Sequence, residues 1–170
     1  ASRRAFGRGR MRDAGTTALA KLLAGVKVGD PLIDGVRMGP LAGKGQVREV
    51  ERSVEKLRAG TELVFGGPGT LDLIGADAEK GAFYPTMLLY DAQPLSSLSA
   101  HSVEAFGPVN TLMPYASVDE AIELAKMGKG SLVGSLFTAK DDVARSVALG
   151  TAAYHGRLML VNRYSAKEST

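Results

Sequence analysis

The part of the sequence that most constrains the fold runs from position 109 to position 161, where strand-like and helix-like segments alternate. Three segments have the length and composition of strands, and two carry apolar residues at helical spacing. The order strand, helix, strand, helix, strand implies right-handed crossovers and a parallel sheet with helices packed on it. The five segments are Val109–Tyr115, a helix opened by the capping box of Ser117 and Glu120, Leu132–Phe137, Asp141–Leu149 and Arg157–Val161. The chain is therefore predicted to be an α/β protein with a mostly parallel sheet.

The N-terminal part of the sequence predicts a smaller number of regular elements. Apolar residues recur at helical spacing in two stretches, and Gly and Pro residues interrupt the sequence between them. A run of glycines farther along lacks the GxGxxG spacing of a nucleotide-binding loop and is expected to be a turn. The expected elements are a helix over Met11–Ala24, a connecting loop over Val26–Gly43, an amphipathic helix carrying Val47, Val50, Val54 and Leu57 and stopped at Gly60, strands over Glu62–Phe65 and Phe83–Tyr90, and a turn at Gly66–Gly69.

Length and composition limit the class of protein. With 170 residues, 45% hydrophobic and 23% charged, residues 1–170 are expected to form a single domain with its own core. No apolar run approaches the length of a membrane span, so no membrane association is expected. Cysteine is absent, which removes disulfides, thiolate metal sites and a thiol nucleophile from this chain. His101 and His155 are far apart and lack spaced carboxylates, so no metal site is expected.

Basic residues give the chain a net charge of +3 and a pI of about 9.2. Five arginines lie close together at the N-terminus, but aromatic residues do not alternate with them and no nucleic-acid motif accompanies them. We interpret this cluster as a solvated face, or as a patch for a phosphorylated cofactor or partner, and expect no nucleic-acid binding. The five residues are Arg3, Arg4, Arg8, Arg10 and Arg12.

The stretch EAFGP at positions 104–108 allows two interpretations. In the first it is only a turn, because Gly107 has wide conformational freedom and Pro108 fixes its own φ. Phe106 would then anchor the core and Glu104 would be a solvated charge. In the second interpretation these two side chains bind a ligand, and the local pattern alone favours the turn, because short motifs in a single sequence are weak signals.

Several stretches together resemble the catalytic domain of the aldehyde dehydrogenase superfamily. These stretches are VGDPLIDGVRMGPLAGKGQV, LVFGG, AFYPTMLL, HSVEAFGPVNTLMPY, SVDEAIELA and SLVGSLFT, in this order. Finer details in GADAEKGAFYPTMLL, AAYHGRLMLVN and SAKEST resemble the branch of the family in which the dehydrogenase is fused to an enoyl-CoA hydratase. That branch acts on a ring-opened CoA-thioester semialdehyde in phenylacetate degradation. The resemblance implies the fold of an aldehyde dehydrogenase catalytic domain.

The resemblance also implies roles for residues of EAFGP. In the family the acid of E-x-FGP binds the ribose hydroxyls next to the nicotinamide, and the Phe packs beside the nicotinamide ring. These cofactor-binding roles would fall on Glu104 and Phe106, and the cofactor would be NADP or NAD. A carboxylate can accept hydrogen bonds from two hydroxyls, and an aromatic face can restrain a flat ring.

The catalytic residues of the family would lie outside this chain. A Cys thiolate attacks the aldehyde, the thiohemiacetal gives hydride to NAD(P)+, and a water activated by a Glu hydrolyses the thioester. ASRR at positions 1–4 resembles the end of the family's C-T-A-x-R-R segment, which would place the nucleophile just upstream. We therefore expect a fragment that is inactive alone, with no catalytic residue of its own and a cofactor-binding domain upstream. The resemblance to the fused branch would allow a hydratase domain downstream.

The expected partners are a CoA-linked aldehyde and further copies of the chain in a homo-oligomer, and the expected location is the cytoplasm. The alternative is a non-catalytic α/β module for oligomerisation or interaction. Three features depart from the family pattern or have no assigned role. Ala5–Asp13 is richer in Gly and Arg than the apolar strand and helix start of the family, so the sequence gives little support for a first strand. Asn162 matches a family V-N, for which a structural role is at least as good, and His101 has no role.

Overall fold

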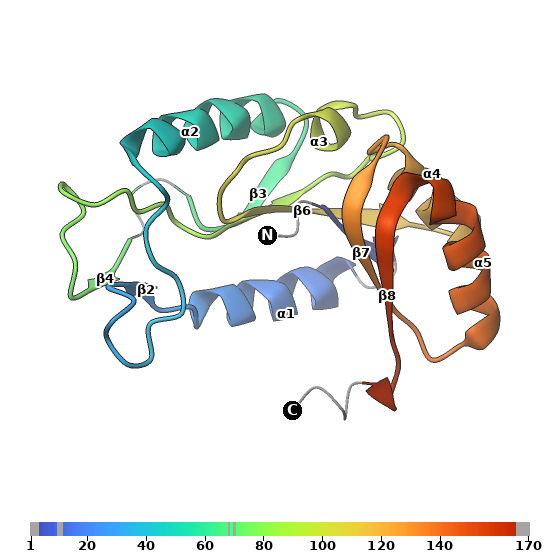
Figure 1. The fold of residues 1–170 in the computed structure, drawn as a ribbon. Helices are drawn as coiled ribbons and strands as arrows, with labels where there is room; N and C mark the ends of the chain where they lie inside the picture. Colours follow the sequence, from blue (N-terminus) through green and yellow to red (C-terminus); the bar gives the residue numbers. More distant parts are fainter. Residues whose placement is uncertain (1–3, 10–11, 68, 70, 166–170) are drawn as a thin grey trace. The chain divides into compact units, whose positions relative to one another are not determined.

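A computed structural model describes residues 4–9, 12–67, 69 and 71–165 and contains two compact units, Ala1–Pro114 and Tyr115–Thr170. Both units contain helices and strands (Figure 1). The elements are β1 (Arg4–Arg8), α1 (Arg12–Ala24), β2 (Val28–Gly29), α2 (Lys44–Arg58), β3 (Glu62–Phe65), β4 (Leu73–Ile74), β5 (Met87–Tyr90), α3 (Ser99–Ser102), β6 (Val109–Tyr115), α4 (Val118–Lys126), β7 (Ser131–Phe137), α5 (Asp141–Thr151), the 3-10 turn η2 (Ala152–Tyr154) and β8 (His155–Val161). None of the described helices is both long and apolar enough to cross a membrane.

The first unit is built on a four-stranded sheet in the order β1-β6-β5-β3. β5 and β6 are parallel, with Met87 opposite Val109, whereas β3 is antiparallel to β5. β2 and β4 form a separate parallel pair in which Val28 lies opposite Leu73. The α/β fold with a mostly parallel sheet that the sequence predicts is confirmed.

Helices cover both faces of the four-stranded sheet. Successive side chains of a strand point to opposite faces, so β5 contributes to two clusters of buried residues. Met87 and Leu89 pack with α2, and Leu88 and Tyr90 pack on the side of α1. Figure 1 shows α2 on one side of these strands and α1 on the other. The first unit therefore has three layers, with the sheet in the middle.

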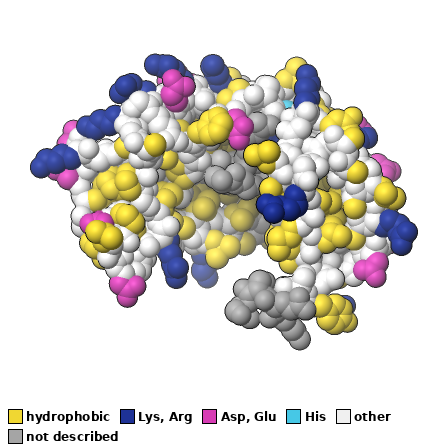
Figure 2. Space-filling view, viewed as in Figure 1, with side chains coloured by type: hydrophobic (Ala, Val, Ile, Leu, Met, Phe, Trp, Pro, Cys, Tyr) yellow, Lys and Arg dark blue, Asp and Glu magenta, His cyan; other side chains and the backbone are white. Residues whose placement is uncertain are grey.

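The α2 helix has the strongly amphipathic character that the sequence predicts. Val50, Val54 and Leu57 are buried at helical spacing, and they pack in the cluster beneath the helix. The charged residues of α2 are exposed, and Figure 2 shows basic and acidic side chains gathered along the upper edge of the view, where α2 lies. This helix is held by its apolar stripe and keeps its charges in water.

The second unit contains four of the five segments of the predicted alternation, because the first strand, β6, belongs to the sheet of the first unit. The three predicted strands therefore do not share one sheet. β7 and β8 pair in parallel, from Ser131 opposite His155 to Phe137 opposite Val161. The α5 helix joins these strands and contacts α4. The prediction of parallel strands joined by a helix is confirmed here, and α5 runs two residues past the predicted end, to Thr151.

Three differences from the expected elements have physical causes. β5 begins at Met87 rather than at Phe83, because Pro85 has no N–H to donate to a neighbouring strand. The predicted loop over Val26–Gly43 contains β2, whose two residues are too few to produce a periodic pattern. β1 does form over Arg4–Arg8 despite its glycine and arginines, since it is paired at the edge of the sheet. Met11, the predicted start of the first helix, lies outside the described residues.

The capping box at the start of α4 is confirmed, and it gives a testable expectation. The Oγ of Ser117 accepts a hydrogen bond from the N–H of Glu120 at 3.1 Å, and the Glu120 carboxylate accepts one from the N–H of Ala116 at 2.9 Å. We expect Ser117→Ala to lower the free energy of unfolding by about 1 kcal/mol, because one N–H at the helix start loses its acceptor. Urea unfolding measures the loss, and Ser117→Asp, which keeps an acceptor, should unfold like the unmodified chain. Equal losses in both variants would contradict this role.

Candidate functional site

The predicted cofactor-binding residues lie in an extended segment between α3 and β6. Val103, the residue after α3, has φ of −91° and ψ of 128°, and partly buried and exposed side chains alternate from there to Phe106. Val103 and Ala105 are partly buried and pack against the main core cluster. Glu104 is exposed, and Phe106 is 70% exposed. The alternation places Glu104 and Phe106 on one outward face.

The exposure of Phe106 bears directly on the two interpretations of EAFGP. A phenyl ring that anchors the core is expected to be buried, because its burial is what contributes to stability. Phe106 has most of its surface in water, whereas Val109, three residues later, is 4% exposed. Phe106 is therefore not a core anchor, and this part of the turn-only interpretation is wrong.

Two consecutive tight turns shape the segment after Phe106. The Gly107 N–H donates to the Ala105 carbonyl oxygen at 2.7 Å, and the Val109 N–H donates to the Gly107 carbonyl oxygen at 2.8 Å. Each bond spans two residues, which is the pattern of a γ-turn, with Phe106 and Pro108 at the centres. The carbonyl oxygen of Pro108 accepts a hydrogen bond from the Met87 N–H at 2.9 Å. The bend is thus fixed to the first residue of β5.

Gly107 is required for space rather than for an unusual backbone angle. Its φ lies outside the left-handed region, unlike the φ of several other glycines of this chain. A Cβ at position 107 would lie 2.8 Å from Cγ2 and 3.1 Å from Cγ1 of Val50, which is fully buried on α2. The expectation that Gly107 uses dihedral angles closed to other residues is therefore wrong, and close packing on α2 is the reason for glycine.

Gln46 is a residue of the site that sequence reasoning did not identify. It lies in the first turn of α2, where its Nε2 donates a hydrogen bond to the carbonyl oxygen of Phe106. Its Oε1 accepts one from the Ala42 N–H at 3.0 Å. Because Gln46 and Phe106 are 60 residues apart in sequence, no local pattern could have indicated this contact. It fixes the backbone from which the exposed ring projects.

The cluster beneath the bend also contains a titratable group, Tyr84. Burial raises the pKa of the Tyr84 phenol, and the negative charge of Glu51 raises it further. The hydroxyl lies 3.6 Å from Sδ of Met87, within the cluster that includes Val50. Stability that depends on the neutral phenol is present below its usual pKa of 10.0 and is lost as the pH rises through the raised value. The phenol is therefore uncharged at neutral pH.

The packing of Gly107 on Val50 gives a prediction for this bend. We expect Gly107→Ala to lower the free energy of unfolding by about 1–3 kcal/mol, because the added methyl group overlaps a packed side chain. In the double variant Gly107→Ala/Val50→Ala, the methyl group enters the space that Val50 leaves. The double variant should lose at least about 0.5 kcal/mol less than the sum of the single losses. Urea unfolding of the four proteins measures this, and strictly additive losses would contradict the contact.

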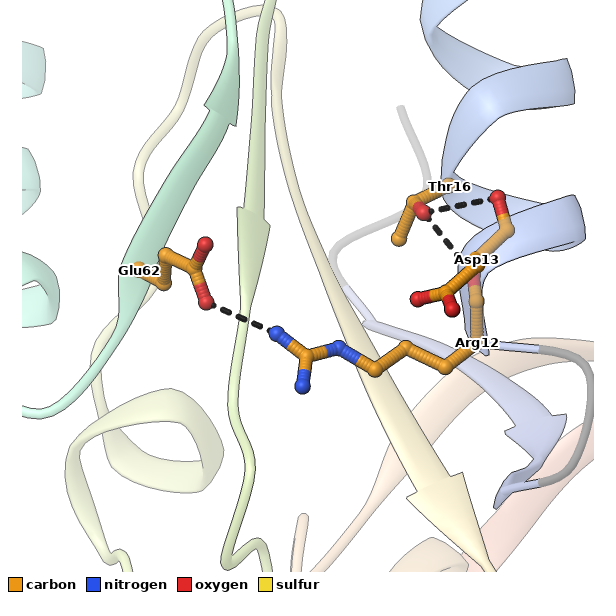
Figure 3. A network of polar contacts seen from close by, with 4 residues as sticks. All are labelled: Arg12, Asp13, Thr16 and Glu62. Atoms are coloured by element: carbon orange, nitrogen blue, oxygen red, sulfur yellow. Dashed lines mark hydrogen bonds and ion pairs between the residues drawn. The ribbon is translucent and has the colours of Figure 1, made fainter.

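Two arginines of the N-terminal cluster, Arg4 and Arg12, contact other side chains of the first unit. Nη1 of Arg4 lies 2.9 Å from Nδ1 of His101. The guanidinium of Arg12 lies 4.3 Å from the centre of the Tyr90 ring and binds Glu62 on β3 at 3.0 Å. Figure 3 shows Arg12 reaching from the start of α1 toward Glu62. Arg3 and Arg10 lie outside the described residues, so the cluster as a whole is not placed.

Asn162 and His155, which the sequence analysis also considered, lie at hydrogen-bond distance from backbone groups. The Oδ1 of Asn162 accepts hydrogen bonds from the N–H groups of Tyr164 and Ser165 at 2.8 and 3.0 Å, so Asn162 stabilises the turn after β8. Nδ1 of His155 lies 3.4 Å from the carbonyl oxygen of Thr151. Within the described part of the chain, no three His, Asp or Glu side chains gather where they could hold a metal ion.

Comparison with known proteins assigns the family. The sequence profile of the aldehyde dehydrogenase family matches residues 1–168. The 3,4-dehydroadipyl-CoA semialdehyde dehydrogenase of Aromatoleum evansii is 41% identical over 145 residues, which are 85% of this chain and 28% of that protein. Protein MaoC of Klebsiella aerogenes is 45% identical over 134 residues, which are 78% of this chain and 38% of that protein. The chain thus spans less than half the length of both relatives.

Solved structures agree with this assignment. The succinic semialdehyde dehydrogenase of Streptococcus pyogenes, solved with NADP+, superposes with a TM-score of 0.77 and 25% identity over 92% of this chain and 32% of that one. The aldehyde dehydrogenase C of Pseudomonas syringae, solved with NAD+ and octanal, superposes with a TM-score of 0.78 and 26% identity over 92% of this chain and 31% of that one. The sequence motifs, the mostly parallel sheet and the profile match agree, and the chain belongs to the aldehyde dehydrogenase family.

Proposed function

We propose that this chain is the cofactor-facing part of an NAD(P)-dependent aldehyde dehydrogenase. Glu104 and Phe106 bind the nicotinamide half of the cofactor, and the whole protein oxidises a CoA-linked semialdehyde to the acid. The chain has no cysteine, so the nucleophile belongs to another part of the protein and the chain alone is inactive.

One observation carries the proposal. Glu104 and Phe106 point outward from the same side of an extended segment, while their neighbours Val103 and Ala105 pack against the core. A large aromatic side chain exposed beside a carboxylate is poorly explained by packing alone. The hydrogen bonds at Phe106 and Pro108 hold the segment, so its shape is set before a ligand binds.

The chemistry of the two side chains suits a nicotinamide nucleotide. The Glu104 carboxylate can accept hydrogen bonds from both hydroxyls of a ribose, and bonds to a charged acceptor are stronger than neutral ones. The face of Phe106 can restrict the tilt of a flat aromatic ring. NAD(P)+, when bound, accepts the hydride that leaves the aldehyde carbon. Glu104 and Phe106 would fix the position of the ring that receives it, which lowers the cost of reaching a reactive geometry.

The identity of the substrate is inferred from the relatives. The Aromatoleum evansii protein carries the name of a CoA semialdehyde dehydrogenase and shares 41% identity with this chain. We therefore infer a ring-opened CoA-thioester semialdehyde, as in phenylacetate degradation, for the whole protein. A cytoplasmic location follows from this proposal, since CoA thioesters are intracellular metabolites.

The test uses the longer protein that contains this chain together with the nucleophile. The ring-opened semialdehyde should be supplied with and without its CoA group, and with NAD+ or NADP+ in separate reactions. Formation of the reduced nicotinamide is followed by its absorbance. We expect turnover with one cofactor or both. The kcat/KM for the CoA-linked aldehyde should be at least about tenfold higher than the kcat/KM for the same aldehyde without CoA.

The outcomes separate the parts of the proposal. Turnover with free aldehydes alone would refute the CoA-linked substrate and leave the dehydrogenase activity. Absence of turnover with any aldehyde would favour the alternative, a module for oligomerisation or interaction. Assembly is expected in either case: Leu132, Phe137 and Met159 on β7 and β8 are 90%, 74% and 52% exposed, which supports a homo-oligomer. Light scattering of the longer protein measures the assembly.

A further inference from the structure

His101 is a buried histidine in the helix that leads into the cofactor-binding bend. It is 4% exposed and lies in α3, three residues before Glu104. Its Nε2 is 2.7 Å from the carbonyl oxygen of Pro94, and its Nδ1 is 2.9 Å from Nη1 of Arg4. Both ring nitrogens therefore have a partner at hydrogen-bond distance.

The two partners determine which nitrogen carries the proton. A carbonyl oxygen can only accept, so the His101 Nε2 must donate to Pro94. A guanidinium can only donate, so the His101 Nδ1 must accept from Arg4. The geometry thus requires the neutral imidazole protonated at Nε2. The ring acts as an acceptor toward β1 and as a donor toward the loop that precedes α3.

The Arg4 contact connects two parts of the first unit that are distant in sequence. Arg4 is the first residue of β1, and it lies 97 residues before His101. The β1 strand is next to β6, which begins directly after the bend. Phe6 of β1 packs against the same core cluster as Val103 and Ala105. The pairing of His101 with Arg4 therefore ties the start of β1 to the segment that carries Glu104 and Phe106.

We propose that His101 is a positioning residue that holds the bend carrying Glu104 and Phe106 at a fixed position relative to the start of β1. This inference rests on the proposed function and on the resemblance of ASRR to the family segment that carries the nucleophile, which would place the nucleophile and the aldehyde it holds just upstream of β1. The two hydrogen bonds of His101 then fix the distance between the aldehyde and the nicotinamide. If the bend shifts relative to β1, hydride transfer should slow more than cofactor binding weakens.

The experiment compares replacements that remove or keep the two hydrogen bonds in the longer protein. His101→Leu removes the donor and the acceptor, whereas His101→Gln keeps one of each and stays neutral. We expect kcat to fall at least about tenfold in His101→Leu, because small displacements of reacting groups have large effects on rate. The KM for the cofactor should change less than about threefold, and His101→Gln should restore most of kcat. His155→Leu, the same replacement in the second unit, is the matched control and should keep kcat.

A second variant tests whether Arg4 and His101 act together. Arg4→Gln removes the guanidinium, and the double variant Arg4→Gln/His101→Leu should be no slower than the slower single variant, because both changes break one contact. Amide hydrogen exchange of the same proteins gives a readout that does not depend on turnover. Exchange at residues 103–109 should be faster in His101→Leu than in His101→Gln, while exchange in α2 stays unchanged.

Each outcome decides the inference. Wild-type kcat and exchange in His101→Leu would overturn it, and so would a His101→Gln variant as slow as His101→Leu, since ring packing alone would then matter. If the unmodified protein has no turnover, the proposed function fails, and hydrogen exchange alone still decides whether His101 fixes the bend.

If His101→Leu does not fold, Arg4→Gln and His101→Gln provide the comparison. A slow Arg4→Gln beside a near-normal His101→Gln supports the inference. Wild-type kcat in Arg4→Gln overturns it.

Discussion

Replacing Gly66 by alanine is expected to lower the free energy of unfolding by at least about 3 kcal/mol. Gly66 follows β3 and has a φ of 77°, in the left-handed region that favours glycine. A Cβ there would also overlap the carbonyl oxygen of Thr86 and would lie 3.0 Å from its carbonyl carbon. Backbone atoms cannot move aside as a flexible side chain can, so β3 and the start of β5 would have to separate.

Gly69 provides a matched control for this prediction. Its φ of 88° is also in the left-handed region, but among the described residues no atom would lie within 4 Å of a Cβ at this position. Gly69→Ala therefore carries only the cost of the backbone angle, about 1 kcal/mol. Urea unfolding of both variants separates that cost from the overlap with Thr86. Equal losses in the two variants would contradict the close approach of β3 and β5 at Gly66.

Glu104→Gln is expected to lower kcat/KM of the longer protein by about 10–100-fold with little change in thermal stability. The substitution keeps the size of the side chain and removes its charge, and a hydrogen bond to a charged group contributes about 1.5–3 kcal/mol. Glu104 is exposed, so its effect on folding should stay below about 1 kcal/mol. Steady-state rates and melting temperatures, measured on the same preparations, compare the two effects.

Glu55 offers the corresponding control on α2, where it is also exposed. Glu55→Gln removes the same charge from the chain, so any general effect of net charge on the rate appears in both variants. Only Glu104→Gln should be slow. Unchanged rates together with a lowered melting temperature in Glu104→Gln would show that this carboxylate stabilises the fold and does not bind the cofactor.

Local patterns in the sequence predicted most of the regular elements, since those patterns reflect burial. The apolar stripe of α2, the capping box of Ser117 and the strand at Glu62–Phe65 all depend on residues close in sequence. Elements that depend on distant partners were missed or uncertain. β2 exists because it pairs with β4, and β1 forms at the edge of the sheet beside β6.

In the candidate site, too, residues of a short motif could be predicted, whereas residues whose partners are distant in sequence could not. Glu104 and Phe106 could be selected from a five-residue motif, although the motif alone did not show whether Phe106 is buried. Gln46 and His101 act through the carbonyl oxygen of Phe106 and the guanidinium of Arg4, and no sequence pattern connects these pairs. The need for glycine at position 107 was predicted, but its cause was assigned to backbone angles rather than to contact with Val50.

The most direct test of the cofactor-binding role is a single-turnover measurement of hydride transfer in the longer protein. Enzyme in excess is mixed with aldehyde and saturating cofactor, and formation of the reduced nicotinamide is recorded for the unmodified protein, Glu104→Gln and Glu55→Gln. We predict that the rate constant falls at least about tenfold in Glu104→Gln and is unchanged in Glu55→Gln. Equal rate constants in all three proteins would contradict the assignment of Glu104 to the nicotinamide ribose.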